Sequence, residues 1–107
     1  MRGDGYVYRP DSHTPEHLEL NGEPDLAVLK NAIGGGWLEA IPHWNRYEGK
    51  PAVAFCDEEG KMKGLPFNRT ATVLWHKQLK GTVPSLRDML VGAVLVVTGD
   101  EQFMEAL

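Results

Sequence analysis

Cysteine is nearly absent from this sequence, and its scarcity limits the covalent chemistry of the chain. The single residue, Cys56, has no partner within the chain, so no intrachain disulfide can form. It ends the apolar run of residues 52–56. A thiol in such surroundings packs as a small hydrophobic side chain, because burial opposes the thiolate form that reacts with other groups. We therefore predict a structural role for Cys56.

Positive charge is also in short supply. The chain has 11 lysines and arginines against 15 aspartates and glutamates, which gives a net charge of −4 at pH 7. The one local basic cluster, Lys61, Lys63 and Arg69, is offset by the acidic residues 57–59. Proteins that bind nucleic acids need clustered positive charge to contact the phosphates. The charge balance predicts that nucleic acid is not a partner.

Long apolar runs are missing as well. A membrane-spanning helix needs about 20 consecutive apolar residues, and neither the N-terminus nor any internal stretch approaches that length. We expect a cytoplasmic protein with no membrane partner. The 107 residues suffice for one hydrophobic core, so we expect a single domain over residues 1–107.

Known catalytic patterns are absent or incomplete. Residues 13–17 match the H-x-x-E-H pattern of zinc peptidases, but Pro15 interrupts the helix that would place both histidines on one face. Ser12 and Ser85 lack the G-x-S-x-G surroundings of a nucleophile. Glycines 34–36 follow a predicted helix, whereas a phosphate-binding loop follows a strand. These observations predict a non-catalytic protein without metal or cofactor.

The chain does contain an alternation of strand-like and helical patterns. Short runs rich in β-branched and aromatic residues predict strands, and apolar residues spaced three to four apart predict helices. The expected elements are strands 6–9 and 17–20, a helix 26–33, strands 37–41 and 52–56, a helix 69–80, a strand 90–97 and a final helical turn 101–107.

This order, β-β-α-β-β-α-β, predicts an α+β fold. We expect a mixed, mostly antiparallel sheet of about five strands with the two main helices on one face. The most apolar stretch, 90–97, is expected to be a central strand covered on both faces. Residues 1–5 are expected to be loose, and residues 1–20 to form an extension or edge strands beside a core of residues 25–100. Trp37 is expected in the core.

Two predicted helices begin after residues that favour capping. Asp25 precedes the first helix and Asn68 the second, and both side chains can accept a hydrogen bond from a free N–H of the first turn. The free N–H groups and the helix dipole around Asn68 also favour an anion, to which Arg69 could add a charged contact. Two interpretations stay open: Asn68 as a cap, or Asn68, Arg69 and Thr70 as a ligand site.

The polar segment 43–50 carries two large aromatic side chains. Trp44 and Tyr47 flank Arg46, and these residue types are enriched at contact surfaces. The first interpretation makes Trp44, Arg46 and Tyr47 partner-binding residues. The alternative is that both rings fold back over the edge of the sheet.

Three blocks of the sequence resemble a known family: AVLKNAIGGGWLEAI, CDEEGKMKGLPFNRTAT and LVGAVLVVTGD. The most specific part is an acidic turn, a glycine, Leu-Pro and x-Asn-Arg-x-Ala, from Asp57 to Ala71, with the asparagine at Asn68. The blocks lie between Asp25 and Asp100 and resemble small proteins of bacteriophages and bacteria, catalogued as a domain of unknown function common in actinobacterial phages. The resemblance implies a phage-type accessory protein of the bacterial cytoplasm, with no established activity or cofactor.

These observations lead to two hypotheses about function. The preferred one is a non-catalytic accessory protein that binds and modulates a host protein. The alternative is a small-molecule binder that sequesters an anionic, nucleotide-like ligand at the helix start around Asn68. An unpaired edge strand, 6–9 or 37–41, would also allow a homodimer by strand pairing.

Overall fold

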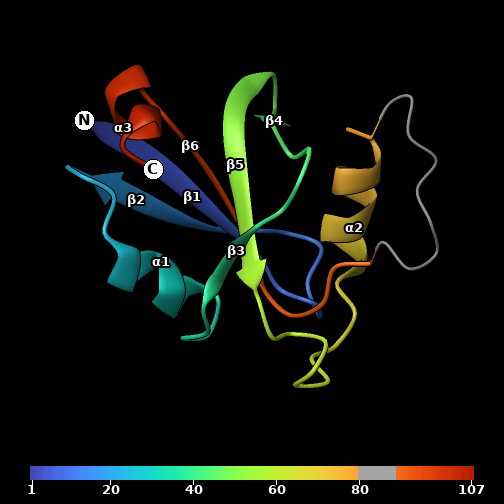
Figure 1. The fold of residues 1–107 in the computed structure, drawn as a ribbon. Helices are drawn as coiled ribbons and strands as arrows, with labels where there is room; N and C mark the ends of the chain where they lie inside the picture. Colours follow the sequence, from blue (N-terminus) through green and yellow to red (C-terminus); the bar gives the residue numbers. More distant parts are fainter. Residues whose placement is uncertain (80–88) are drawn as a thin grey trace.

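A computed structural model describes residues 1–79 and 89–107 of the chain as an antiparallel sheet with three helices (Figure 1). The strands lie in the order β2-β1-β6-β5-β3, and β4 pairs with β5 beside that path. This arrangement confirms the α+β class. The elements are β1 (Arg2–Tyr8), β2 (Glu16–Asn21), α1 (Leu26–Ala32), β3 (Leu38–Ala40), β4 (Arg46–Tyr47), β5 (Lys50–Asp57), α2 (Arg69–His76), β6 (Val94–Gly99) and α3 (Glu101–Glu105).

Strand β6 is the centre of the sheet, as expected for the most apolar stretch. Val94 and Val96 belong to one buried cluster and Leu95 and Val97 to another, and all four side chains are inaccessible to solvent. The alternation follows from the two-residue period of a strand. The strand begins at Val94 rather than at residue 90, because Gly92 has a φ of 72° and turns the backbone out of extended geometry.

The helices cover opposite faces of the sheet, so the prediction of both main helices on one face is wrong. Helix α2 packs on the face of Val94 and Val96, while α1 and α3 pack on the face of Leu95 and Val97 (Figure 1). The physical reason lies in β6 itself, because a strand that is apolar on both sides needs cover on both sides. Helix α2 ends at His76, and residue 80 of the predicted helix lies outside the described residues.

The N-terminal residues form an internal strand, which corrects the expectation that residues 1–5 are loose. Strand β1 pairs with β2 on one side and with β6 on the other, from Arg2 onward. Gly3 permits this position, because a Cβ there would lie 2.5 Å from the ring of Phe103 in α3. Strand β2 is one edge of the sheet and β3 the other, so residues 6–9 are not an edge.

None of the helices in the described ranges is long and apolar enough to cross a membrane.

Candidate functional site

Asn68 is a buried junction rather than a surface cap. Its side chain is inaccessible to solvent, and its Oδ1 accepts from the N–H of Ala71 at 3.1 Å. Its Nδ2 donates to the carbonyl oxygens of Tyr8 at 2.8 Å and Gly92 at 2.9 Å. The capping prediction is therefore confirmed, and the same side chain also joins α2 to β1 and to the segment before β6. A ligand in solvent cannot reach it.

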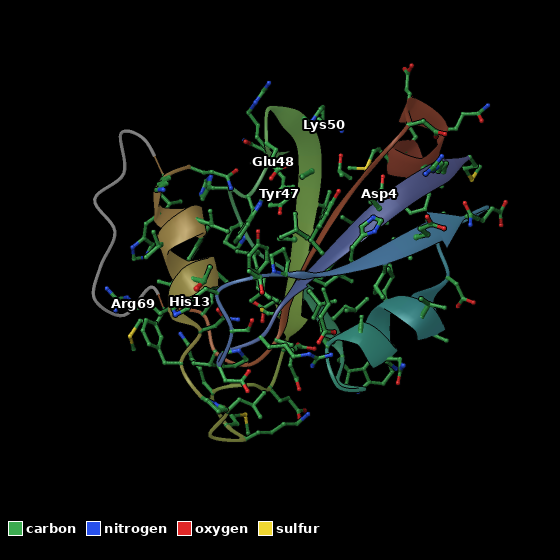
Figure 2. All side chains as sticks on the ribbon, turned by 180° about the vertical axis from the view of Figure 1, so that it is seen from behind. Asp4, His13, Tyr47, Glu48, Lys50 and Arg69 are labelled. Atoms are coloured by element: carbon green, nitrogen blue, oxygen red, sulfur yellow. The ribbon has the colours of Figure 1, made fainter. Side chains whose placement is uncertain are left out.

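The other two residues of the predicted ligand site lie nearer to solvent. Arg69 is exposed at the start of α2, and Thr70 is half-buried (Figure 2). The next polar residue, Thr72, is buried, and its hydroxyl already has two hydrogen-bond partners within the protein. Its hydroxyl donates to the carbonyl oxygen of Asn68 at 2.7 Å and accepts from the N–H of Leu90 at 3.0 Å. The sequence-predicted trio is thus divided between a buried residue and the surface.

Trp44 is buried, so the prediction of an exposed aromatic pair is wrong. Only 4% of Trp44 is exposed, and it packs in the cluster beneath α2. Tyr47 is half-buried, its hydroxyl lies 2.7 Å from that of Tyr8, and its ring centroid lies 4.8 Å from that of Tyr6. Burial, followed by the hydrogen bond to Tyr8, raises the pKa of Tyr47. The rings of Trp44 and Tyr47 pack onto the sheet, as in the alternative interpretation.

Arg46 of the same segment is exposed, and its guanidinium donates to the carbonyl oxygen of Gly49 at 3.2 Å. Trp37, and not Trp44, is the exposed tryptophan of this region. It is 63% exposed, contrary to the core position predicted for it, and Lys30 Nζ lies 3.9 Å from the centroid of its ring. The three glycines before Trp37 are the sequence signal for this outcome, because they separate it from α1.

Trp37 leads directly into the open edge of the sheet at β3. Strands β3 and β4 both pair with β5. The outer side of β4 is covered by another part of the chain, whereas within the described residues the outer side of β3 is not. Near β4, the N–H groups of Asn45 and Arg46 both donate to Oε1 of Gln78, each at 3.0 Å, so the segment after α2 covers that end. At the β3 end, Glu39 and Ala40 are exposed.

The backbone of β3 presents hydrogen-bonding groups to solvent. Glu58 N–H donates to the Trp37 carbonyl at 2.9 Å, and Ile41 N–H donates to the Ala54 carbonyl at 2.8 Å. In an antiparallel pair, residues alternate between facing the partner strand and facing away from it. The N–H and C=O groups of Leu38 and Ala40 therefore point away from β5. No hydrogen bond within residues 1–79 and 89–107, the part of the chain that the structure describes, engages these four groups.

A pocket of about 340 Å³ lies beside β3, on the face that α2 covers. That volume is within the range of about 300–1,000 Å³ that is typical of ligand pockets. Its apolar lining comes from distant parts of the chain, and Trp75 Nε1 holds one wall by donating to the carbonyl of Pro42 at 2.7 Å. Apolar lining residues include Ile41, Met62, Trp75, Met89, Leu90 and Val91.

The charged lining of this pocket is mostly acidic. Glu39 and Glu58 are exposed, the carboxylate of Asp57 is paired with Lys63 Nζ at 2.7 Å, and Lys61 also lines the pocket. The Cys56 thiol lies beside these charged residues and also lines the pocket. Burial raises its pKa to about 11, with a further rise from the carboxylates of Glu39 and Asp57 that Lys61 opposes. Cys56 is therefore a protonated, unreactive thiol at neutral pH.

This arrangement can accept an extended peptide as an additional strand. In such binding, main-chain hydrogen bonds to an open edge supply affinity, and pockets beside the edge select side chains. Leu38, Glu39 and Ala40 were not among the residues predicted to form a site. The only signal available was the prediction of residues 37–41 as a potential edge strand.

The fold and the site together define a small α+β domain in which the sheet edge at β3 lies next to an apolar pocket. The family described as "Domain of unknown function (DUF3846)" matches residues 1–106, so the chain belongs to that family. This confirms the resemblance to a domain of unknown function and extends it over β1 and β2, which the three sequence blocks did not cover. Comparisons with curated proteins and with solved structures found no match.

Proposed function

We propose that this protein is a non-catalytic accessory protein of the phage type, which acts in a bacterial cytoplasm by binding an extended segment of a host protein. The segment adds to the sheet as a strand outside β3. The phage and host part of the proposal rests on the sequence resemblance. The binding mode rests on the open edge of β3 beside the pocket.

The observation that carries the proposal is the outward orientation of the backbone groups of Leu38 and Ala40. An unpaired edge is a template for another strand, and natural proteins normally blunt such edges with charge, proline or cover. Strand β3 has a single charged residue, Glu39, and an apolar pocket beside it. An exposed tryptophan, Trp37, precedes it, and tryptophan is enriched among residues that dominate binding energy.

The other edge of the sheet is better defended. Strand β2 carries the carboxylates of Glu16 and Glu19, and such charges discourage strand addition. The hollow beside it has a volume of about 240 Å³, and its lining includes the carboxylates of Glu19, Glu23 and Asp25 together with apolar residues such as Leu20, Val28 and Leu29. Strand β2 therefore serves as the internal control for β3.

A pair of proline variants tests the proposal. Ala40→Pro removes one outward N–H from β3, and proline is tolerated on edge strands where the N–H faces solvent. Glu19→Pro removes an outward N–H from β2, because Gly22 N–H donates to the Met1 carbonyl and alternation turns Glu19 outward. In affinity capture from a bacterial lysate, we expect a protein recovered with wild type and Glu19→Pro to be lost with Ala40→Pro.

Amide hydrogen exchange locates the contact independently of any variant. When the captured protein binds, the N–H groups of Leu38 and Ala40 should become protected from exchange, while that of Glu19 should exchange as in the free protein. If binding leaves both β3 amides unprotected, the proposed edge is not the site. Equal recovery with all three proteins in the capture experiment leads to the same conclusion.

A further inference from the structure

The position of Glu39 constrains the chemistry of any strand that pairs with β3. Glu39 lies between the two residues whose backbone groups point outward, so it would face the residue opposite as a non-hydrogen-bonded pair. Such pairs bring Cα atoms to about 4.5 Å, and their side chains lie on the same face of the sheet. Glu39 pairs with Cys56 on its inner side, and both line the pocket. The residue opposite Glu39 therefore projects over the pocket.

The charge at that position favours a cation. Glu39 and Glu58 contribute two exposed carboxylates near the pocket, whereas Lys63 is engaged with Asp57. Lys61 also lines the pocket, and its effect on the pKa of the Cys56 thiol is smaller than that of the Glu39 carboxylate. A side chain with an aliphatic stem and a charged end suits this place, because the stem can cover apolar lining such as Met62 while the charge stays near Glu39.

A second copy of the chain fits this edge poorly. Only one antiparallel register uses the outward groups of both Leu38 and Ala40 in both copies, and it places Glu39 directly opposite Glu39 of the second copy. Like charges directly opposite each other in a sheet are destabilising. The homodimer predicted from an unpaired edge would have to overcome this repulsion.

We infer that the strand recognised by β3 comes from a different protein and carries a lysine or arginine opposite Glu39. The inference rests on the proposed function, since it names the chemistry of the segment that binds there. It assigns Glu39 a role in selecting the partner, while the backbone of Leu38 and Ala40 supplies the pairing.

A set of four synthetic peptides tests this inference. All four alternate valine and threonine and differ only at the central residue, which is lysine, arginine, norleucine or glutamate. Norleucine retains the aliphatic stem of lysine without its charge. From the strength of partly exposed ion pairs, we expect lysine and arginine peptides to bind about three- to fivefold more tightly than the norleucine peptide. The glutamate peptide should bind most weakly.

Two glutamine variants assign the preference to one residue. Glu39→Gln should abolish the difference between the lysine and norleucine peptides, and raising the salt concentration should reduce that difference in the wild type. Glu19→Gln, an exposed glutamate on the opposite edge strand, should leave the difference unchanged.

The outcomes separate the inference from the function on which it rests. Equal affinities for lysine and norleucine peptides, with Leu38 and Ala40 protected from amide exchange, would overturn the basic preference and leave strand addition intact. If no peptide protects these two amides, the open edge does not accept a strand, and the proposed function is overturned as well. A doubled mass in light scattering at neutral pH, lost in Ala40→Pro, would show that a second copy occupies the edge instead.

Discussion

Asn68 shows how one side chain can have a second role that its sequence position does not reveal. As a helix cap, asparagine is interchangeable with aspartate, because both offer an oxygen to the first turn. In this protein the amide nitrogen of Asn68 is used as well, since it donates to the carbonyl oxygens of Tyr8 and Gly92. Aspartate has no such donor, so the equivalence of the two residues does not hold at this position.

We expect Asn68→Asp to be strongly destabilising. The change removes both donors and places a carboxylate against two buried carbonyl oxygens, and an uncompensated buried charge costs about 3–5 kcal/mol of unfolding free energy. Asn68→Ala loses the same hydrogen bonds without burying a charge, so we expect a smaller loss of about 1–3 kcal/mol. Urea denaturation of the purified variants measures both values.

Asp25 provides the matched control for this comparison. It caps α1 by accepting from the N–H of Ala27 at 2.9 Å, and it is exposed. Asp25→Asn should change the unfolding free energy by less than about 0.5 kcal/mol, because both residues cap and neither is buried there. An Asn68→Asp variant as stable as Asp25→Asn would contradict the buried hydrogen bonds on which the prediction depends.

At the scale of elements, the packing of α3 over β1 depends on the absence of a side chain at Gly3. The ring of Phe103 is fully buried and occupies the space where a Cβ of residue 3 would lie. Helix α3 is held in place by its cap, Asp100, which accepts from the N–H of Phe103 at 2.8 Å and from that of Arg2 at 2.8 Å. The ring therefore has little freedom to move away.

Gly3→Ala should lower the unfolding free energy by about 1–3 kcal/mol, the usual cost of overpacking a core. Gly5→Ala should cost less, because its Cβ would lie 3.2 Å from a Leu95 methyl group, a milder contact. Thermal unfolding of both variants measures this difference. In a double-mutant cycle, Phe103→Leu should cost less in the Gly3→Ala background than in the wild type. Additive effects would show that the ring and residue 3 do not collide.

At the scale of the whole molecule, acid should destabilise the fold through several carboxylates at once. The pKa of Asp57 is lowered chiefly by the hydrogen bond from Lys63 and then by the N–H of Glu59. The pKa of Glu16 is lowered by Arg9, and that of Asp100 chiefly by the N–H of Phe103. Each group binds its proton less readily when folded than when unfolded. Their stabilising contributions are therefore present above the ordinary carboxyl pKa and are lost as the pH falls through the lowered values.

We expect the unfolding free energy to fall between about pH 5 and pH 2. In Asp57→Asn the decrease should be shallower, because an amide keeps an oxygen for the Glu59 N–H but has no charge to lose. Urea denaturation across this pH range compares the two proteins. A constant difference between the wild type and Asp57→Asn at every pH would show that the Asp57–Lys63 pair contributes nothing to the acid sensitivity.

The sequence by itself determined the features that depend on near neighbours. Asp25 and Asn68 cap their helices, and Gly34, with a φ of 98°, follows the end of α1. The central position of β6 was also readable, because a continuous run of apolar residues is stable only when both of its faces are covered. These features follow from local backbone geometry and from side-chain spacing along a few residues.

Only the tertiary structure decided which side chains are buried and which edge is open. Trp37 was expected in the core and is exposed, and of the two positions left open for Trp44, at a contact surface or folded back onto the sheet, the structure has the buried one. Both are large amphipathic rings near strands, so their burial depends on whether an element distant in sequence covers them. The same holds for β3, which stays open because the contact from Gln78 covers the edge only at Asn45 and Arg46. The hydrogen bonds from Asn45 and Arg46 to Gln78 join residues 33 and 32 positions apart. The sequence pattern of a single helix or strand cannot predict such contacts.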